Sequence, residues 1–125
     1  MSRMERVLGI GGFFFRAADP EALAAWYENN LGIAGMASQW SWEQEAGPTV
    51  FAPFASDTDY FGRMDQQCML NFRVRDLDAM LAQLRAAGAL VEDEISEASF
   101  GRFGHVVDPE GNRFELWERA ESPEP

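Results

Sequence analysis

Residues 15–31 read FRAADPEALAAWYENNL, and residues 72–88 read FRVRDLDAMLAQLRAAG. In both stretches a Phe-Arg pair ends an apolar segment that is typical of a strand. An Asp that suits the N-cap of a helix follows, and after it apolar residues recur at helical spacing. Two copies of one strand–helix unit in a short chain indicate a duplicated module. A cleft between two such halves is a favourable place for a small-molecule site.

The first half is expected to hold one helix between strands. The apolar run Val7–Ala17 predicts a strand, and the apolar spacing after it predicts a helix over residues 20–31. Trp40 and Trp42 stand at strand spacing, and Thr49–Phe54 predicts a later strand.

The second half repeats the same order more clearly. It is expected to contain one helix, from Asp76 to Ala86, and a dense turn signal at Asp108–Asn112. The strands expected in this half are Cys68–Val74, Ala89–Glu92, Phe100–Val107 and Arg113–Glu118.

The chain has 125 residues, of which 46% are hydrophobic. This content supports one compact core and is too small for two independent ones. We therefore expect a single domain over residues 1–125, with a first module at about 7–56, a connector at about 57–66 and a second module at about 67–118.

The formal net charge is −11. A strongly acidic chain is repelled by phosphate backbones and anionic lipid surfaces, so neither nucleic acid nor a membrane is an expected partner. No stretch reaches the roughly 18 apolar residues that a membrane span needs. The single cysteine, Cys68, cannot form an internal disulfide. These features predict a cytoplasmic protein.

The two repeats, followed by GRFGHVVDPEGNRFELWE over residues 101–118, resemble the vicinal oxygen chelate superfamily. That superfamily includes glyoxalase I, extradiol dioxygenases, fosfomycin-resistance enzymes and bleomycin-binding proteins. The resemblance implies an α+β fold in which two pseudo-symmetric βαβββ modules form a curved mixed sheet around a cleft. It also implies a homodimer and, in many enzymes of this kind, a divalent metal.

The metal-ligand positions of such enzymes are poorly matched here. The resemblance places ligands at Gly12, at Met69 and at Glu115, and a fourth near Thr49–Phe54. Glycine has no ligand atom, a thioether suits hard divalent ions poorly, and Thr49–Phe54 offers no carboxylate, His or Gln. We therefore expect no tightly held metal and no other cofactor. The alternative is a metal-dependent lyase or dioxygenase that joins Glu115 and His105 to ligands from elsewhere.

Strand alternation sorts the remaining side chains into two faces. The strands concerned are those predicted at Val7–Ala17, Cys68–Val74 and Arg113–Glu118. One set of their side chains is apolar throughout and is expected to pack against the helices: Phe13, Phe15, Leu70, Phe72, Val74, Phe114 and Leu116. The other set is expected to face the cleft and to bind substrate there: Phe14, Met69, Asn71, Arg73 and Trp117.

His105 is the only histidine, and the turn at Asp108–Asn112 brings it back toward Arg113 or Glu115. A His–carboxylate pair in an apolar cleft can exchange protons near neutral pH, which makes Glu115 and His105 the candidate catalytic pair. The alternatives are a half-exposed strand histidine and a carboxylate held by a nearby arginine.

These observations predict a glyoxalase-like protein that binds a small, partly apolar organic molecule, or a metal-independent isomerase or lyase that acts on one. Besides the metalloenzyme, the second alternative is a non-catalytic structural or regulatory module. A homodimer is expected, with the aromatic-rich segment Trp40–Phe61 as its contact.

Overall fold

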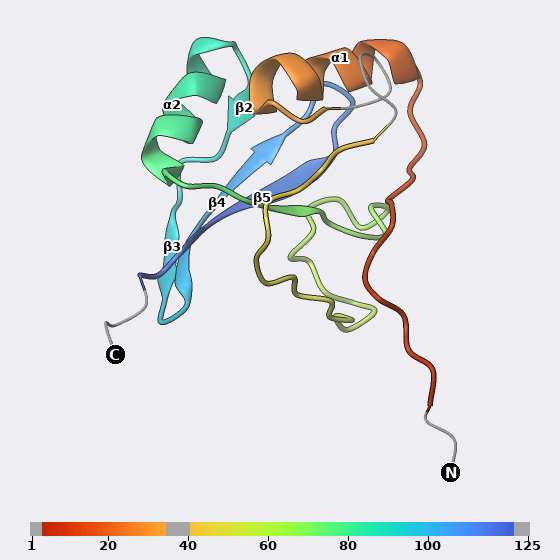
Figure 1. Ribbon diagram of the computed structural model, residues 1–125. Coiled ribbons are helices and arrows are strands. Elements are labelled where there is room, and N and C mark those ends of the chain that lie inside the picture. Colours follow the sequence, from red (N-terminus) through yellow and green to blue (C-terminus); the bar gives the residue numbers. More distant parts are fainter. Residues whose placement is uncertain (1–3, 35–40, 122–125) are drawn as a thin grey trace.

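Two helices cover one face of a mixed five-stranded sheet in the computed structural model, which describes residues 4–34 and 41–121 (Figure 1). In chain order the elements are α1 (Pro20–Leu31), β1 (Asn71–Arg73), α2 (Leu77–Ala86), β2 (Leu90–Val91), β3 (Ser96–Ala98), β4 (Gly101–Val107) and β5 (Arg113–Arg119). None of the helices within these described ranges is long and apolar enough to cross a membrane.

The sheet runs in the order β1-β5-β4-β2, and β3 also pairs with β4. β1 is parallel to β5, whereas β4 is antiparallel to β5, β2 and β3. The strand–helix–strands order expected for the second half is therefore present. The predicted α+β fold with a curved mixed sheet is confirmed.

Both repeats form helices that begin where the sequence predicts. The carboxylate of Asp19 accepts a hydrogen bond from the backbone N–H of Ala22 (3.2 Å), and the carboxylate of Asp76 accepts one from Ala79 (3.0 Å). Each Asp thus satisfies a free N–H in the first turn of its helix. Gly32 ends α1 with φ +72°, a left-handed conformation that glycine adopts at little cost.

The main core lies between the two helices and the sheet. Alternation along the strands holds: Phe114 and Leu116 of β5 are fully buried on the helix side, and Phe72 of β1 packs against them. The core residues are Leu23, Tyr27, Leu77, Leu81, Leu84, Val106, Phe114 and Leu116.

Asp108, at the start of the β4–β5 turn, is a buried carboxylate with four hydrogen-bond donors. One oxygen accepts bonds from the Tyr27 hydroxyl (2.7 Å) and the Asn112 side-chain amide (2.8 Å). The other accepts bonds from the backbone N–H groups of Glu110 (2.8 Å) and Asn112 (3.0 Å). Burial and the bond to Asp108 raise the pKa of Tyr27, so its hydroxyl keeps its proton.

The same turn also anchors the start of α1. The carboxylate of Glu110 accepts hydrogen bonds from the backbone N–H groups of Ala18 (2.6 Å) and Asp19 (2.9 Å). A negative charge at a helix N-terminus is favourable, because unpaired N–H groups and the positive end of the helix dipole meet there. The turn between the last two strands thus fixes the first helix.

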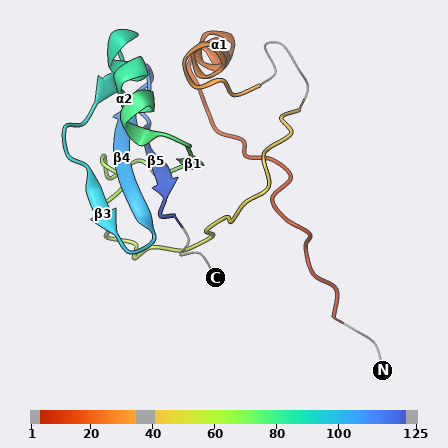
Figure 2. The ribbon, with the colours of Figure 1, turned by 60° about the vertical axis from the view of Figure 1, so that its left-hand side comes forward.

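The strands predicted at Val7–Ala17 and Thr49–Phe54 are wrong for the single chain, because neither segment pairs with the sheet. The N-terminal segment runs away from the sheet in both views (Figures 1 and 2). Phe13 and Phe15, expected to face the helices, are 45% and 46% exposed. Trp42 lies in no strand, and Trp40 falls outside the described residues. A strand forms only where a neighbouring strand accepts its hydrogen bonds.

We expect Asp108→Ala to lower the free energy of unfolding by about 3 kcal/mol, because it leaves a buried Tyr27 hydroxyl and turn N–H groups without an acceptor. Tyr27→Phe, which removes one bond only, should cost about 1 kcal/mol. Urea unfolding followed by circular dichroism measures both. The exposed Asp57→Ala serves as control and should change stability by less than about 0.5 kcal/mol. Equal effects of Asp108→Ala and Asp57→Ala would contradict the role of Asp108.

Candidate functional site

Glu115 lies at the centre of a polar network on the sheet face opposite the helices. In the register of the sheet it stands beside His105 of β4 on one side and Asn71 of β1 on the other. Its Oε1 accepts a hydrogen bond from the Asn71 amide (2.7 Å), and its Oε2 accepts one from the Tyr60 hydroxyl (2.5 Å). His105 Nε2 lies 2.9 Å from Oε2.

Glu115 and His105 form a buried pair, with 7% and 5% of each residue exposed. Burial alone would raise the pKa of Glu115, but His105 and the hydrogen bonds from Tyr60 and Asn71 outweigh it and lower that pKa. The carboxylate is therefore ionised at neutral pH. His105 Nε2 lies within ion-pair distance of Glu115 Oε2. The ring is not oriented for a hydrogen bond, however, so Nε2 makes none in the described residues.

Tyr60 is the partner of Glu115 that sequence reasoning missed. It belongs to the connector, and its ring stands edge-on to the His105 ring at 5.3 Å between centroids and stacks on Phe54 at 5.8 Å. Burial and the hydrogen bond to Glu115 raise the pKa of Tyr60 to about 12. The sequence showed only that aromatic residues are dense in and before the connector. That density did not indicate a contact between Tyr60 and Glu115.

The connector is held on β5 by two side chains. Gln66 accepts a hydrogen bond from the Arg113 N–H (2.9 Å) and donates one to the Arg113 carbonyl (2.8 Å). The Arg113 guanidinium forms a bidentate pair with Glu92 (2.7 and 2.8 Å) and donates to the Tyr60 carbonyl. Arg113 therefore positions the loop that carries Tyr60, rather than pairing with Glu115.

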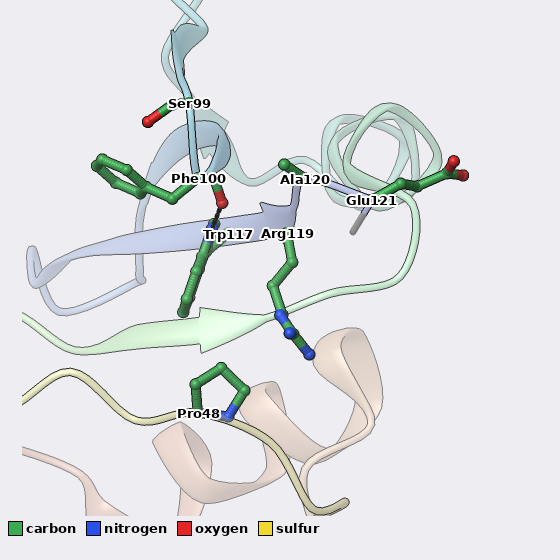
Figure 3. A pocket seen from close by; sticks show the side chains of 7 residues that line it. All are labelled: Pro48, Ser99, Phe100, Trp117, Arg119, Ala120 and Glu121. Carbon is green, nitrogen blue, oxygen red and sulfur yellow. Dashed lines mark hydrogen bonds between the residues drawn. The ribbon is translucent and has the colours of Figure 1, made fainter. Parts of the chain in front are cut away.

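Trp117 follows Glu115 on the same face of β5 and lines an open hollow of about 300 Å³ (Figure 3). Its Nε1 donates to the Phe100 carbonyl (3.0 Å), and its ring stacks on Phe103 at 6.0 Å with an interplanar angle of 10°. The residues that line the hollow are Pro48, Ser99, Phe100, Trp117, Arg119, Ala120 and Glu121.

The structure brings only some of the predicted cleft residues together. Asn71, His105 and Glu115 meet directly, whereas Phe14 is 93% exposed on the extended N-terminal segment. Arg73 donates to the backbone carbonyl of Glu45 (3.0 Å).

Met69, the remaining predicted cleft residue, is half-buried just before β1. The catalytic and substrate-binding roles of all these residues remain predictions.

The residues around Glu115 do not fit a divalent metal. Both oxygens of Glu115 already contact protein donors, and two of those donors, the Asn71 amide and the Tyr60 hydroxyl, carry protons toward the carboxylate. Among the described residues, no group of three His, Cys, Asp or Glu side chains is arranged to hold a metal ion.

Residues 12–117 match the family model described as a glyoxalase-like domain, and the chain therefore belongs to that family. The membership in the vicinal oxygen chelate superfamily expected from the sequence is thereby confirmed. A search of curated proteins found no match.

Among solved structures, the chain resembles TnmS3, an antibiotic binding protein from Streptomyces sp. CB03234. The two share 25% identity with a TM-score of 0.64, over 94% of this chain and 100% of that one. A glyoxalase/bleomycin resistance protein/dioxygenase superfamily member from Sphaerobacter thermophilus DSM 20745 shares 18% identity (TM-score 0.51, 82% of this chain and 90% of that one). At that identity it shows the fold alone.

We expect acid to destabilise the protein through Glu115. The lowered pKa of this carboxyl in the folded state means that its contribution is complete above about pH 4.5, the ordinary value, and is lost as the pH falls toward the folded value. Glu115→Gln should cost about 2 kcal/mol at pH 7 and flatten the loss of stability between pH 5 and pH 3. Urea unfolding at several pH values measures this.

The exposed Glu43→Gln is the matched control and should keep the acid dependence of the wild-type protein. If Glu115→Gln and wild type lose stability in parallel below pH 5, the network does not hold Glu115 ionised.

Proposed function

We propose that this protein binds a small, partly apolar organic molecule on the β5 face that carries Glu115 and Trp117, without a tightly held metal. The observation that carries the proposal is the hollow beside Trp117, whose lining combines the aromatic residues Phe100 and Trp117 with the polar residues Ser99 and Arg119. Small-molecule sites combine these features: mostly apolar walls with a few directed polar groups.

The Trp117 side of the hollow is fixed by contacts within the fold. Trp117 is held by its hydrogen bond to Phe100 and by stacking on Phe103, so its position is fixed before any ligand arrives. A preformed wall favours binding, because little side-chain entropy is lost when the ligand docks.

The likeness to TnmS3 supports the same function. That protein is an antibiotic binding protein, and the similarity extends over nearly the whole of both chains. A cytoplasmic location, as the sequence predicts, suits a protein that captures a small molecule inside the cell.

A metal-independent isomerase or lyase is the second candidate, favoured by the 2.9 Å approach of His105 to Glu115. Such an enzyme would use the pair for proton transfer. Binding is the better-supported function, because the Glu115 oxygens are occupied by Tyr60 and Asn71 and its lowered pKa makes it a weak base. A structural or regulatory module would show neither ligand binding nor turnover.

We expect the neutral aromatic probe 2-naphthamide to bind the protein, and Phe100→Ala to weaken that binding about fivefold, because the 60% exposed Phe100 ring forms one wall of the hollow. Trp117→Phe, which reduces the neighbouring aromatic wall, should weaken the binding by a similar factor. Ligand-observed NMR titration measures the dissociation constants.

Phe13→Ala, which removes an exposed ring on the N-terminal segment, is the control and should leave the constant unchanged. A protein that does not bind the amide, or binds it equally well in all four forms, would refute the proposal.

We also propose that the protein is a homodimer. The extended segments that form no strand expose large apolar side chains, among them Val7, Leu8 and Phe14 near the N-terminus and Val50 and Phe51 further on. Each of these five side chains is 73% exposed or more. Large apolar side chains that are exposed in such number favour an interaction site in a soluble protein. A second copy of the chain, with the same unpaired segments, is the partner we infer.

Phe51→Asp should therefore shift the protein from dimer to monomer at micromolar concentration, because a charge in a dehydrated contact is unfavourable. Light scattering coupled to size-exclusion chromatography measures the mass. Leu90→Asp is the control and should leave the dimer intact. Leu90 is an exposed apolar residue (65%) on the edge strand β2, outside the segments named above. A monomeric mass for the wild-type chain would refute the dimer.

A further inference from the structure

We infer that the hollow at the end of β5 selects planar aromatic acids, with Arg119 pairing the ligand's anionic group. This inference rests on the proposed binding function and names the ligand class for the same site. It follows from three observations: the character of the walls, the position and pairing of Arg119, and the fixed geometry around Gly101.

The walls of the hollow are suited to a flat ring. In Figure 3 the Trp117 ring is directed toward Pro48, and Phe100 and Ala120 add apolar surface to the lining of the hollow. Phe100 is 60% exposed, so its ring has apolar surface to lose when a ligand covers it. Aromatic ligands gain both from area burial and from ring–ring geometry in such a site.

Arg119 supplies the cation. Trp117 and Arg119 are alternate residues of β5 and point to the same face, and Figure 3 shows both side chains directed toward Pro48. The other lining charge, Glu121, points away from Arg119 in that view.

Arg119 also differs from Arg102 and Arg113, the other arginines of β4 and β5. Arg102 pairs with Asp78, Glu97 and Glu118, and Arg113 pairs with Glu92. In the described part of the chain, no carboxylate lies within ion-pair distance of Arg119. A guanidinium without a partner, beside apolar walls, is matched by a carboxylate that can accept its paired N–H groups.

Gly101 keeps the hollow in shape. It has φ +145°, and a Cβ at this position would collide with the Glu118 carbonyl and the Trp117 indole. The missing side chain lets the indole reach the Phe100 carbonyl across the β3–β4 turn. The Trp117 ring therefore has a fixed position beside Arg119. A ligand that binds there contacts the ring with its aromatic part and Arg119 with its anionic group.

The test compares 2-naphthoate with 2-naphthamide, which share a ring system and differ in charge. We expect the wild-type protein to bind the naphthoate about fivefold more tightly than the amide, as an exposed ion pair allows. Arg119→Gln should remove this preference, so that the two probes bind with similar dissociation constants, and Arg119→Lys should restore part of it. Raising the salt concentration should weaken naphthoate binding only.

Arg85→Gln is the matched control, because Arg85 is an exposed arginine in the last turn of α2, away from the hollow. It should leave both constants unchanged. If the amide binds in a Phe100-dependent way but Arg119→Gln leaves naphthoate affinity unaltered, the charge selectivity is overturned while the binding function stands. If neither probe binds, the binding function and this inference both fall.

Discussion

The carboxylate of Asp108 is the interaction on which the rest of the fold depends. It closes the turn between β4 and β5 and holds the Tyr27 hydroxyl of α1 at the same time. A single buried charge with four donors sets both the hairpin register and the position of the first helix. That register places His105 opposite Glu115, so the turn determines the relative position of these two site residues.

A second buried carboxylate, Glu115, organises the opposite face of the sheet. Removing a carboxylate from water costs several kcal/mol unless partners replace the lost hydration. Here β1, β4 and the connector each supply one partner, namely Asn71, His105 and Tyr60. The network therefore draws the connector onto the sheet as well as defining a polar centre. Two residues further along β5, Trp117 lines the aromatic hollow.

The repeated strand–helix unit and the DPEGN turn were enough to predict both helices, the β4–β5 hairpin and the face of each β5 residue. The strands predicted in the first half failed for a physical reason. Alternation indicates which residues of Val7–Ala17 would share a face, but a strand also needs hydrogen bonds to a neighbouring strand, and this segment pairs with no strand of the described chain. Tyr60 escaped prediction because it lies in a turn of the connector, where neither strand alternation nor helical spacing indicates the direction of a side chain. Periodicity reports local structure, and such contacts arise only from the folded connector.

Gln66 has a consequence for how the sheet meets its surroundings. Parallel pairing with β1 covers β5 from Glu115 to Trp117, which leaves the backbone of Arg113 beyond the end of β1. The Gln66 amide bonds both the N–H and the carbonyl of that residue, as a neighbouring peptide unit would. One side chain thus imitates a further strand and satisfies an edge that another polypeptide could otherwise extend into an aggregate. The connector thus closes this stretch of the β5 edge with a single amide side chain.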